Sequence, residues 1–166
     1  MEPVETTAGG RALRIRRATA QDVPAIVALL TDDAIGAGRE RADDLEPYRR
    51  AFAAVDADPA HLIVVAEVDG EVAATLQLSL LPGLSRQGAL RAQVEGVRVG
   101  GAHRGSGLGT ALLRWALGES RDRGAALVQL TTDLRREDAR RFYERLGFAG
   151  SHLGMKLDLG AGPAGA

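Results

Sequence analysis

The stretch "VEGVRVGGAHRGSGLGTALLRW" (Val94–Trp115) decides the fold of this chain. It opens with an apolar, strand-like run and then places five glycines within residues 100–109. Beyond them, Leu108, Leu112 and Trp115 recur at helical spacing. A loop almost free of side chains therefore ends at a helix N-terminus, where backbone N–H groups are unpaired and the helix dipole is positive. We expect this loop to bind an anion, with a diphosphate as the best fit.

The sequence argues against three other interpretations of the glycine loop. A P-loop needs Gly-Lys followed by Ser or Thr, and the only lysine of the chain is Lys156. A Rossmann site needs Gly-x-Gly-x-x-Gly after the first strand of a parallel sheet. Here the spacing is Gly105-x-Gly107-x-Gly109, and it follows a meander. The third interpretation is a plain linker in a chain that contains 21 glycines.

The remaining segments predict a mixed α/β fold. Asp69-Gly70 between two β-rich runs predicts a tight hairpin, and a third strand follows at 89–99. A strand, helix, strand crossover then makes two strands parallel neighbours. The expected order is β-α-α-β-β-β-α-β-α-β-β, which ends in two strands. Six of its seven strands have residue ranges, at 13–19, 61–68, 71–81, 89–99, 125–133 and 152–159, and its helices are at 20–33, 45–55, 108–123 and 135–148.

Length and composition limit the classes of protein that this chain fits. Its 166 residues suit one domain, for which we expect residues 12–159, with a flexible N-terminus at 1–11 and a flexible tail at 160–166. The formal net charge of −1 gives no reason to expect nucleic acid as a partner. No apolar run approaches the ~20 residues of a membrane span. Because the N-terminal segment also lacks a basic stretch followed by an apolar one, we expect a cytoplasmic protein. We expect no metal site, since cysteine is absent and the three histidines are far apart.

Two motifs in this order resemble the GNAT superfamily, the acyl-CoA-dependent N-acyltransferases. "HRGSGLGTALL" matches the family signature Arg/Gln-x-x-Gly-x-Gly/Ala, and "ARRFYERLGF" matches its later block. The second block is particularly similar to small-amine and aminoalkylphosphonate N-acetyltransferase members, although Arg140 replaces their usual histidine. The resemblance implies a GNAT-like fold, in which the strand at 94–99 splays from its parallel neighbour at 127–132.

The resemblance also implies a site for acetyl-CoA as co-substrate. The backbone amides expected to bind its diphosphate are those of Arg104, Gly105, Ser106, Gly107, Leu108, Gly109 and Thr110. Backbone groups of Val97 and Val99 are expected to bind the pantetheine arm. Asp133 stands where the family often has asparagine, so its contact with that arm is open. Arg136 is a further candidate for the cofactor phosphates, with solvent exposure as the alternative.

Two residues are candidates for the acid–base chemistry of amide formation. A protonated amine must lose a proton and the departing thiolate must gain one. Glu95, which period two places on the same strand face as Val97 and Val99, is the candidate base, and an ion pair with Arg98 or Arg91 is the alternative. The resemblance makes the Tyr143 phenol the proton donor to the coenzyme A sulfur, with core packing as the alternative.

The predicted acceptor is a small primary amine, with an amine of a peptide or protein as the second choice. A concentration of acidic side chains near residues 32–46 would favour a cationic acceptor, although a solvated loop is the default. A non-catalytic coenzyme A-binding regulator and a nucleotide-binding or interaction module are the other function classes left open. The exposed edges of a mixed sheet offer a route to a homodimer.

Overall fold

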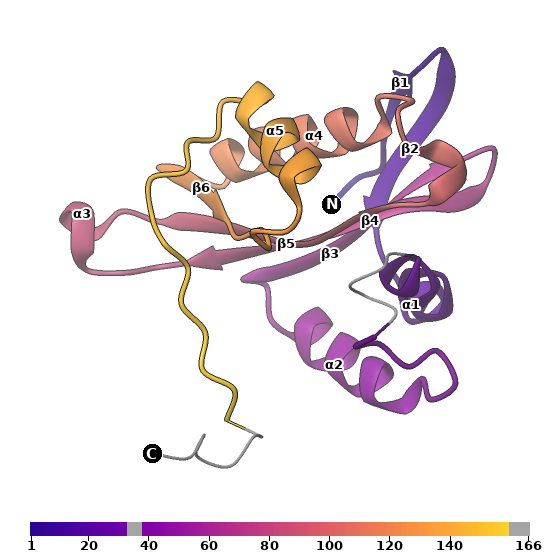
Figure 1. Ribbon diagram of the computed structural model, residues 1–166, viewed down its shortest axis with the longest axis horizontal. Coiled ribbons are helices and arrows are strands. Elements are labelled where there is room, and N and C mark those ends of the chain that lie inside the picture. Colours follow the sequence, from indigo (N-terminus) through magenta and orange to yellow (C-terminus); the bar gives the residue numbers. More distant parts are fainter. Residues whose placement is uncertain (33–37, 160–166) are drawn as a thin grey trace. The chain divides into compact units, whose positions relative to one another are not determined.

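The computed structural model describes residues 1–32 and 38–159 (Figure 1). The chain forms two compact units, Met1–Leu130 and Thr131–Ala166. The first unit holds the whole sheet and the glycine loop. The second holds the "ARRFYERLGF" motif. The predicted tail at 160–166 lies outside the described residues.

The sheet of the first unit has six strands in sequence order. All neighbouring strands are antiparallel except the last two, which are parallel because α4 crosses over between them. The mixed α/β class predicted from the sequence is confirmed. The strands are β1 (Val4–Ala8), β2 (Arg11–Arg17), β3 (His61–Val68), β4 (Glu71–Leu81), β5 (Arg91–Val99) and β6 (Leu127–Leu130).

Helices cover both faces of this sheet. In Figure 1, α1 and α2 lie on one face of β3 to β5, and α4 lies on the other. The helical segments of the first unit are η1 (Ala20–Asp22), α1 (Val23–Thr31), α2 (Glu46–Ala57), α3 (Ser85–Gly88), η2 (Gly101–His103) and α4 (Leu108–Asp122). The second unit contains α5 (Glu137–Arg145). The helix predicted at 108–123 thus forms almost to its predicted ends.

The N-terminus differs from the expectation of a flexible segment at 1–11. Strand β1 pairs with β2 from Val4 opposite Ile15 to Ala8 opposite Arg11. The turn between them is Gly9-Gly10, and both glycines have positive φ (56° and 80°), as a two-residue hairpin turn requires. The expectation was wrong because it weighed polarity and ignored this turn signal.

The C-terminal end also differs from the prediction, which closed the fold with two more strands. In the described part of the second unit, no strand follows α5. Four apolar side chains at alternating positions there are highly exposed: Leu153, Met155, Leu157 and Leu159. An alternation of apolar and other residues indicates which side chains would share a face in a sheet. A strand forms only where a neighbouring strand supplies the backbone hydrogen bonds.

An ion-pair cluster links β2 to the start of α1. The Arg16 guanidinium donates two hydrogen bonds to the Asp22 carboxylate, each 2.7 Å, and its Nε donates to Glu67 at 2.7 Å. The Thr19 amide donates to Asp22 at 2.7 Å, which caps η1. Asp22 is only 8% exposed. The hydrogen bonds from Arg16, and then those from Thr19, lower the pKa of Asp22 from 3.8 to about 2.

Acid should therefore weaken the fold through Asp22. Below its ordinary pKa the unfolded chain binds a proton that the folded chain does not, so we expect about 2 kcal/mol of the free energy of unfolding to be lost between about pH 4 and pH 2. Denaturant titrations across this range measure the loss. Asp22→Asn should flatten this part of the curve and lower stability at pH 7, whereas Asp122→Asn, at an exposed position on α4, should keep the fall. Parallel curves for the wild type and Asp22→Asn would contradict the assignment.

Candidate functional site

The glycine loop ends in a helix whose first amides point out of the helix. Gly107 is the N-cap of α4 with a φ of 85°, and Gly105 has a φ of 76°. Residues other than glycine adopt this left-handed backbone conformation only at a cost in free energy. The first helical hydrogen bond runs from the Ala111 amide to the Gly107 carbonyl at 3.0 Å. The amides of residues 108–110 precede that bond and are the donors a helix N-terminus offers to an anion.

The loop before this helix is stabilised by its own hydrogen bonds. The Arg104 amide donates to the Gly101 carbonyl, and the Ser106 amide donates to His103, both at 3.3 Å. The Ser106 hydroxyl also donates to the His103 carbonyl at 2.6 Å. Two of the seven amides predicted to bind a diphosphate, those of Arg104 and Ser106, are therefore used inside the loop.

The turn between β1 and β2 packs against this loop. A Cβ atom added to Gly9 would lie 2.6 Å from the Ser106 carbonyl oxygen, and one added to Gly107 would lie 3.9 Å from the Gly9 nitrogen. The polarity of residues 1–11 gives no indication of this contact. The Gly9-Gly10 turn was the signal that could have revealed it.

The side chain of Arg104 turns toward the end of α1. Its Nη2 donates to the Asp32 carboxylate at 3.0 Å and to the Asp32 carbonyl, and its Nε donates to the Val99 carbonyl at 3.2 Å. The same carboxylate accepts the Gly101 amide at 2.7 Å. Arg104 thus ties α1 to β5 and the glycine loop, and its charge is partly compensated by Asp32.

Strand β5 loses its parallel neighbour halfway along its length. The β5–β6 ladder runs from Arg91 opposite Leu127 to Val94 opposite Leu130, whereas β5 continues to Val99. A carbonyl accepts up to two hydrogen bonds. The Val97 carbonyl accepts Arg98 Nη1 at 2.8 Å, and the Val99 carbonyl accepts Arg104 Nε. Each of these two hydrogen bonds uses one acceptor position of a carbonyl that is predicted to bind pantetheine.

A β-bulge in β5 changes the sheet face on which Glu95 lies relative to the residues that follow it. Glu95 pairs with Gln77 and Arg98 with Thr75, so two residues of β5, Gly96 and Val97, stand opposite one residue of β4. Gly96 has the left-handed φ of 59° that such a bulge uses.

Directly paired residues share a sheet face, so Glu95 lies on the face of Gln77. Thr75 lies two residues from Gln77 on β4 and shares its face, so Ala74, the next residue along β4, lies on the opposite face. Val99 pairs with Ala74 and therefore lies on that opposite face. The expectation that period two places Glu95 and Val99 on the same face is therefore wrong. Glu95 is exposed, on the face that α1 and α2 cover.

A polar row that the sequence analysis missed crosses this same face. The residues His61, Ser79, Gln93 and Gln129 stand opposite one another on four adjacent strands. His61 Nδ1 lies 2.8 Å from the Ser79 hydroxyl, and Gln129 Nε2 donates to Gln93 Oε1 at 2.7 Å. Gln77 Nε2 also donates to the Ser79 hydroxyl at 3.2 Å. Polar residues at alternate positions of otherwise apolar strands were the available signal.

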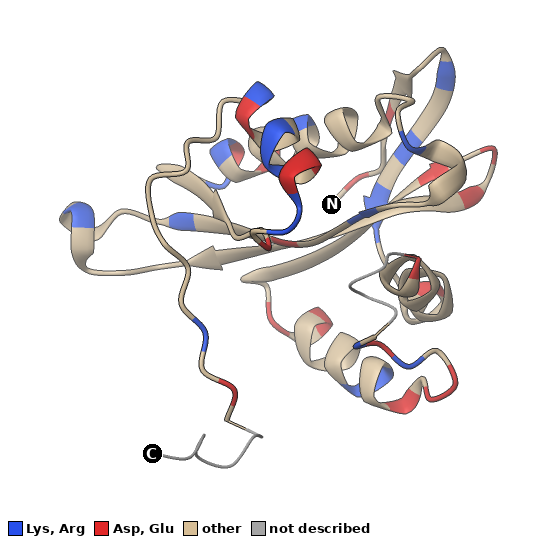
Figure 2. Cartoon of the chain, viewed as in Figure 1, with Lys and Arg blue, Asp and Glu red and all other residues tan. Residues whose placement is uncertain are grey.

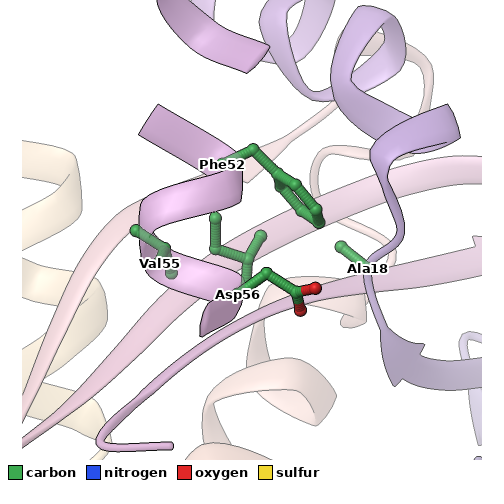
Figure 3. A pocket seen from close by; sticks show the side chains of 5 residues that line it. Ala18, Phe52, Val55 and Asp56 are labelled. Carbon is green, nitrogen blue, oxygen red and sulfur yellow. The ribbon is translucent and has the colours of Figure 1, made fainter. Parts of the chain in front are cut away.

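A cavity of about 160 Å³ lies between α1, α2 and the sheet. Its walls combine apolar side chains of the two helices with residues of β3, β4 and the bulge: Val23, Ile26, Val27, Leu30, Tyr48, Ala51, Phe52, Val55, Ile63, Thr75, Leu76, Gln77 and Gly96. Phe52, Val55 and Ile63 also line a smaller hollow beside Ala18 and Asp56, shown in Figure 3. That hollow has about 0 Å³ of space for a water molecule, so of these two spaces the larger cavity is the one that can hold a ligand.

Acidic residues gather around the loop before α2. Figure 2 shows them in red along this loop and at the first turn of the helix. Glu40 accepts a hydrogen bond from the Tyr48 hydroxyl at 3.0 Å, and Asp43 pairs with Arg41 at 3.1 Å. Asp33, part of the predicted acidic segment, lies outside the described residues.

Among the residues that are described, no three histidine or carboxylate side chains form a group suited to a metal ion. In that same part of the chain, every helix is too short or too polar to cross a membrane.

The second unit places the predicted tyrosine in an aromatic cluster. The Tyr143 ring lies 5.3 Å from the Phe142 ring and 5.9 Å from the Phe148 ring, measured between centroids. Both packing and proton donation remain open to this side chain, because ring contacts hold the ring without using the hydroxyl.

The two candidates before α5 belong to one turn. The Asp133 carboxylate accepts the Arg135 amide at 2.9 Å and the Arg135 guanidinium at 2.8 Å. These hydrogen bonds hold the pKa of Asp133 well below its usual value. The Arg136 amide donates to the Asp133 carbonyl at 2.9 Å. The side chain of Asp133 is thus paired with Arg135, and its contact with the cofactor arm stays a prediction.

Comparisons with known proteins agree with the motifs. The sequence model of the acetyltransferase (GNAT) family matches residues 23–148. The aminoalkylphosphonate N-acetyltransferase of Salmonella typhimurium is 32% identical over 139 residues, which cover 84% of this chain and 86% of that protein. The streptothricin acetyltransferase of Streptomyces lavendulae is 30% identical over 165 residues, which cover 98% of this chain and 75% of that protein.

A solved structure is similar to most of this chain. It is a crystal structure from Bacillus halodurans C-125, described as that of a transcriptional regulator. The two sequences are 42% identical, and the superposition has a TM-score of 0.84 over 89% of this chain and 99% of the other.

Proposed function

Because this chain is an acetyltransferase of the GNAT family, we propose that it transfers the acetyl group of acetyl-CoA to a primary amine of a small molecule. The observation that carries the proposal is the helix N-terminus behind the glycine loop, where the amides of residues 108–110 precede the first helical hydrogen bond. The substrates named for the relatives support a small amine as acceptor. A cytoplasmic location and a homodimer stay predictions.

The proposed cofactor site runs along β5 into α4. The amides of Leu108, Gly109 and Thr110 would hold the diphosphate, with those of Gly105 and Gly107 beside them. The stretch of β5 beyond Val94, where the ladder to β6 has ended, would hold the pantetheine arm through backbone groups of Val97 and Val99. We retain Arg136 as a candidate for phosphate contact. We give Arg104 a structural role through its pairing with Asp32.

The proposed reaction is direct attack of the amine on the thioester in a ternary complex. Glu95, on the sheet face that bears the cavity, takes a proton from the ammonium group directly or through water. The amine nitrogen then forms a bond to the carbonyl carbon, and the carbon–sulfur bond breaks. Tyr143 gives its phenolic proton to the departing sulfur, and the nitrogen loses its second proton, which returns to the Tyr143 phenolate through solvent. Glu95 thus serves the deprotonation that precedes attack, and Tyr143 serves the protonation of the leaving group.

Gly107→Ala tests the diphosphate site. Its φ of 85° is unfavourable for a side chain by about 1 to 2 kcal/mol, so we expect the loop to relax and the dissociation constant for acetyl-CoA to rise about tenfold. Isothermal titration calorimetry measures this change. The matched control is Gly118→Ala on the same helix, where nothing lies within 4 Å of the added Cβ. That control should bind acetyl-CoA with the affinity of the wild type. Its free energy of unfolding should rise by up to about 1 kcal/mol, which raises the temperature of unfolding. Equal affinity in Gly107→Ala and the wild type would contradict this site.

The function is tested by screening primary amines with acetyl-CoA and measuring free thiol. We expect thiol release that depends on the amine and yields the N-acetyl product by mass spectrometry. Acetylation of a peptide lysine or N-terminus in preference to every small amine would move the assignment to the second choice. Release of thiol without an acetylated amine would contradict amide formation.

A regulator that binds acetyl-CoA without turnover is the second candidate function. It is favoured by one observation, the description of the 42% identical structure as a transcriptional regulator. The same assay separates the two functions, because a regulator would bind acetyl-CoA in the calorimeter and release no thiol with any amine.

A further inference from the structure

We infer that the acceptor amine carries an apolar group about the size of one aromatic ring, which fills the cavity between α1, α2 and the sheet. This inference rests on the proposed function, since it names the class of amine that the same site would take. Three features of the described residues support it: the volume of the cavity, its lining and the position of nearby carboxylates.

The volume suits a single ring. The cavity measures about 160 Å³, and an apolar cavity of about 150 Å³ in another protein is known to bind benzene. Its walls include the side chains of Ile26, Leu30 and Val55, with the Phe52 and Tyr48 rings. Figure 3 shows Phe52 reaching from α2 toward Ala18, and Phe52 lines both the cavity and the smaller hollow. An apolar ligand group would gain contacts with these walls that water does not provide.

The lining argues against an anionic acceptor. None of the residues that the structure places in the cavity wall is charged, and the polar side chains among them are those of Tyr48, Thr75 and Gln77. Thr75 donates its hydroxyl proton to the Val64 carbonyl at 2.8 Å. A phosphonate placed here would lose its hydration without gaining a cationic partner, which is strongly unfavourable. The preference should therefore differ from the substrate in the name of the Salmonella typhimurium relative.

Carboxylates at the rim suit the amine end of the same ligand. Glu95 shares a face with the cavity residue Gln77 and directly precedes the cavity residue Gly96. On the helix side, Glu40 accepts the hydroxyl of Tyr48, which lines the cavity. A ligand with its ring against Phe52 and its ammonium group toward Glu95 matches both the apolar and the acidic parts of the site.

A substrate comparison tests the inference. At saturating acetyl-CoA, we expect kcat/KM for 2-phenylethylamine to exceed that for ethylamine and for 2-aminoethylphosphonate by at least about tenfold. Binding of 2-phenylethylamine to the protein is also followed by ligand-observed NMR, which needs no turnover. Binding without thiol release would sustain the inference and reject the proposed function. A preference for the phosphonate, or absence of binding by 2-phenylethylamine, would overturn the inference.

Two variants of α2 locate the ring. Ala51 lines the cavity and Ala53 is exposed outside its lining. Ala51→Phe should fill part of the cavity, reduce the preference for 2-phenylethylamine over ethylamine about tenfold, and weaken the NMR-detected binding. Ala53→Phe should keep both values. Equal effects of the two substitutions, or no effect of Ala51→Phe, would contradict binding in this cavity.

Discussion

Tyr143→Phe is expected to lower kcat about 10²-fold while leaving the dissociation constant for acetyl-CoA unchanged. The substitution keeps the ring and its contacts with Phe142 and Phe148, and removes only the phenolic proton. A thiolate is a poorer leaving group than a thiol, so collapse toward product slows when no proton is supplied. Steady-state kinetics and calorimetry on the same preparation measure the two quantities.

Phe142→Leu is the matched variant for the packing alternative. It removes a ring that lies 5.3 Å from Tyr143 and keeps the hydroxyl. We expect it to lower the temperature of unfolding and to retain most of the turnover at a temperature where the protein is folded. Wild-type turnover in Tyr143→Phe, together with a large loss in Phe142→Leu, would show that Tyr143 serves packing alone.

Glu95→Gln is expected to lower kcat/KM about 10- to 100-fold at neutral pH. Glutamine fills the same space but cannot accept the proton of the ammonium group. An alkyl amine with a pKa near about 10 becomes neutral as the pH rises, so the loss should shrink in alkaline buffer. Rates between pH 7 and about pH 9.5, with acetyl-CoA affinity as the control for binding, provide the measurement.

Glu71→Gln is the matched control for the candidate base. Glu71 is an exposed glutamate at the start of β4, opposite Val68 in the β3–β4 hairpin. Its substitution should leave the rate and its pH dependence unchanged. If Glu95→Gln shows the same pH–rate profile as the wild type, Glu95 is not the base, and an ion pair with a neighbouring arginine becomes its better description.

Local sequence signals predicted the elements that depend on near neighbours. Asp69 and Gly70 adopt φ angles of 54° and 83°, which confirms the predicted hairpin turn. The glycine loop and α4 formed where the motif indicated. Such turns and caps depend on a few adjacent residues, so the printed sequence contains nearly all the information they need.

Features set by pairing between distant segments were harder to predict. The bulge at Gly96 changes which side chains of β5 share a face, and a period-two pattern carries no sign of it. The pairing of Arg104 with Asp32 joins residues 72 positions apart, and no local pattern indicates it. The apolar side chains that alternate from Leu153 to Leu159 are exposed. Here a strand was predicted from the pattern, but no neighbouring strand pairs with the segment in the described residues.

The central claim is that amides at the start of α4 bind the diphosphate of acetyl-CoA. Calorimetric titration with acetyl-CoA and with S-acetylpantetheine, which has the thioester arm but no diphosphate, tests it most directly. We predict saturable binding of acetyl-CoA and binding of the truncated thioester that is weaker by at least about 100-fold, since several charge-assisted hydrogen bonds are lost. No heat with acetyl-CoA at millimolar concentration, or equal affinity for the two ligands, would contradict the claim.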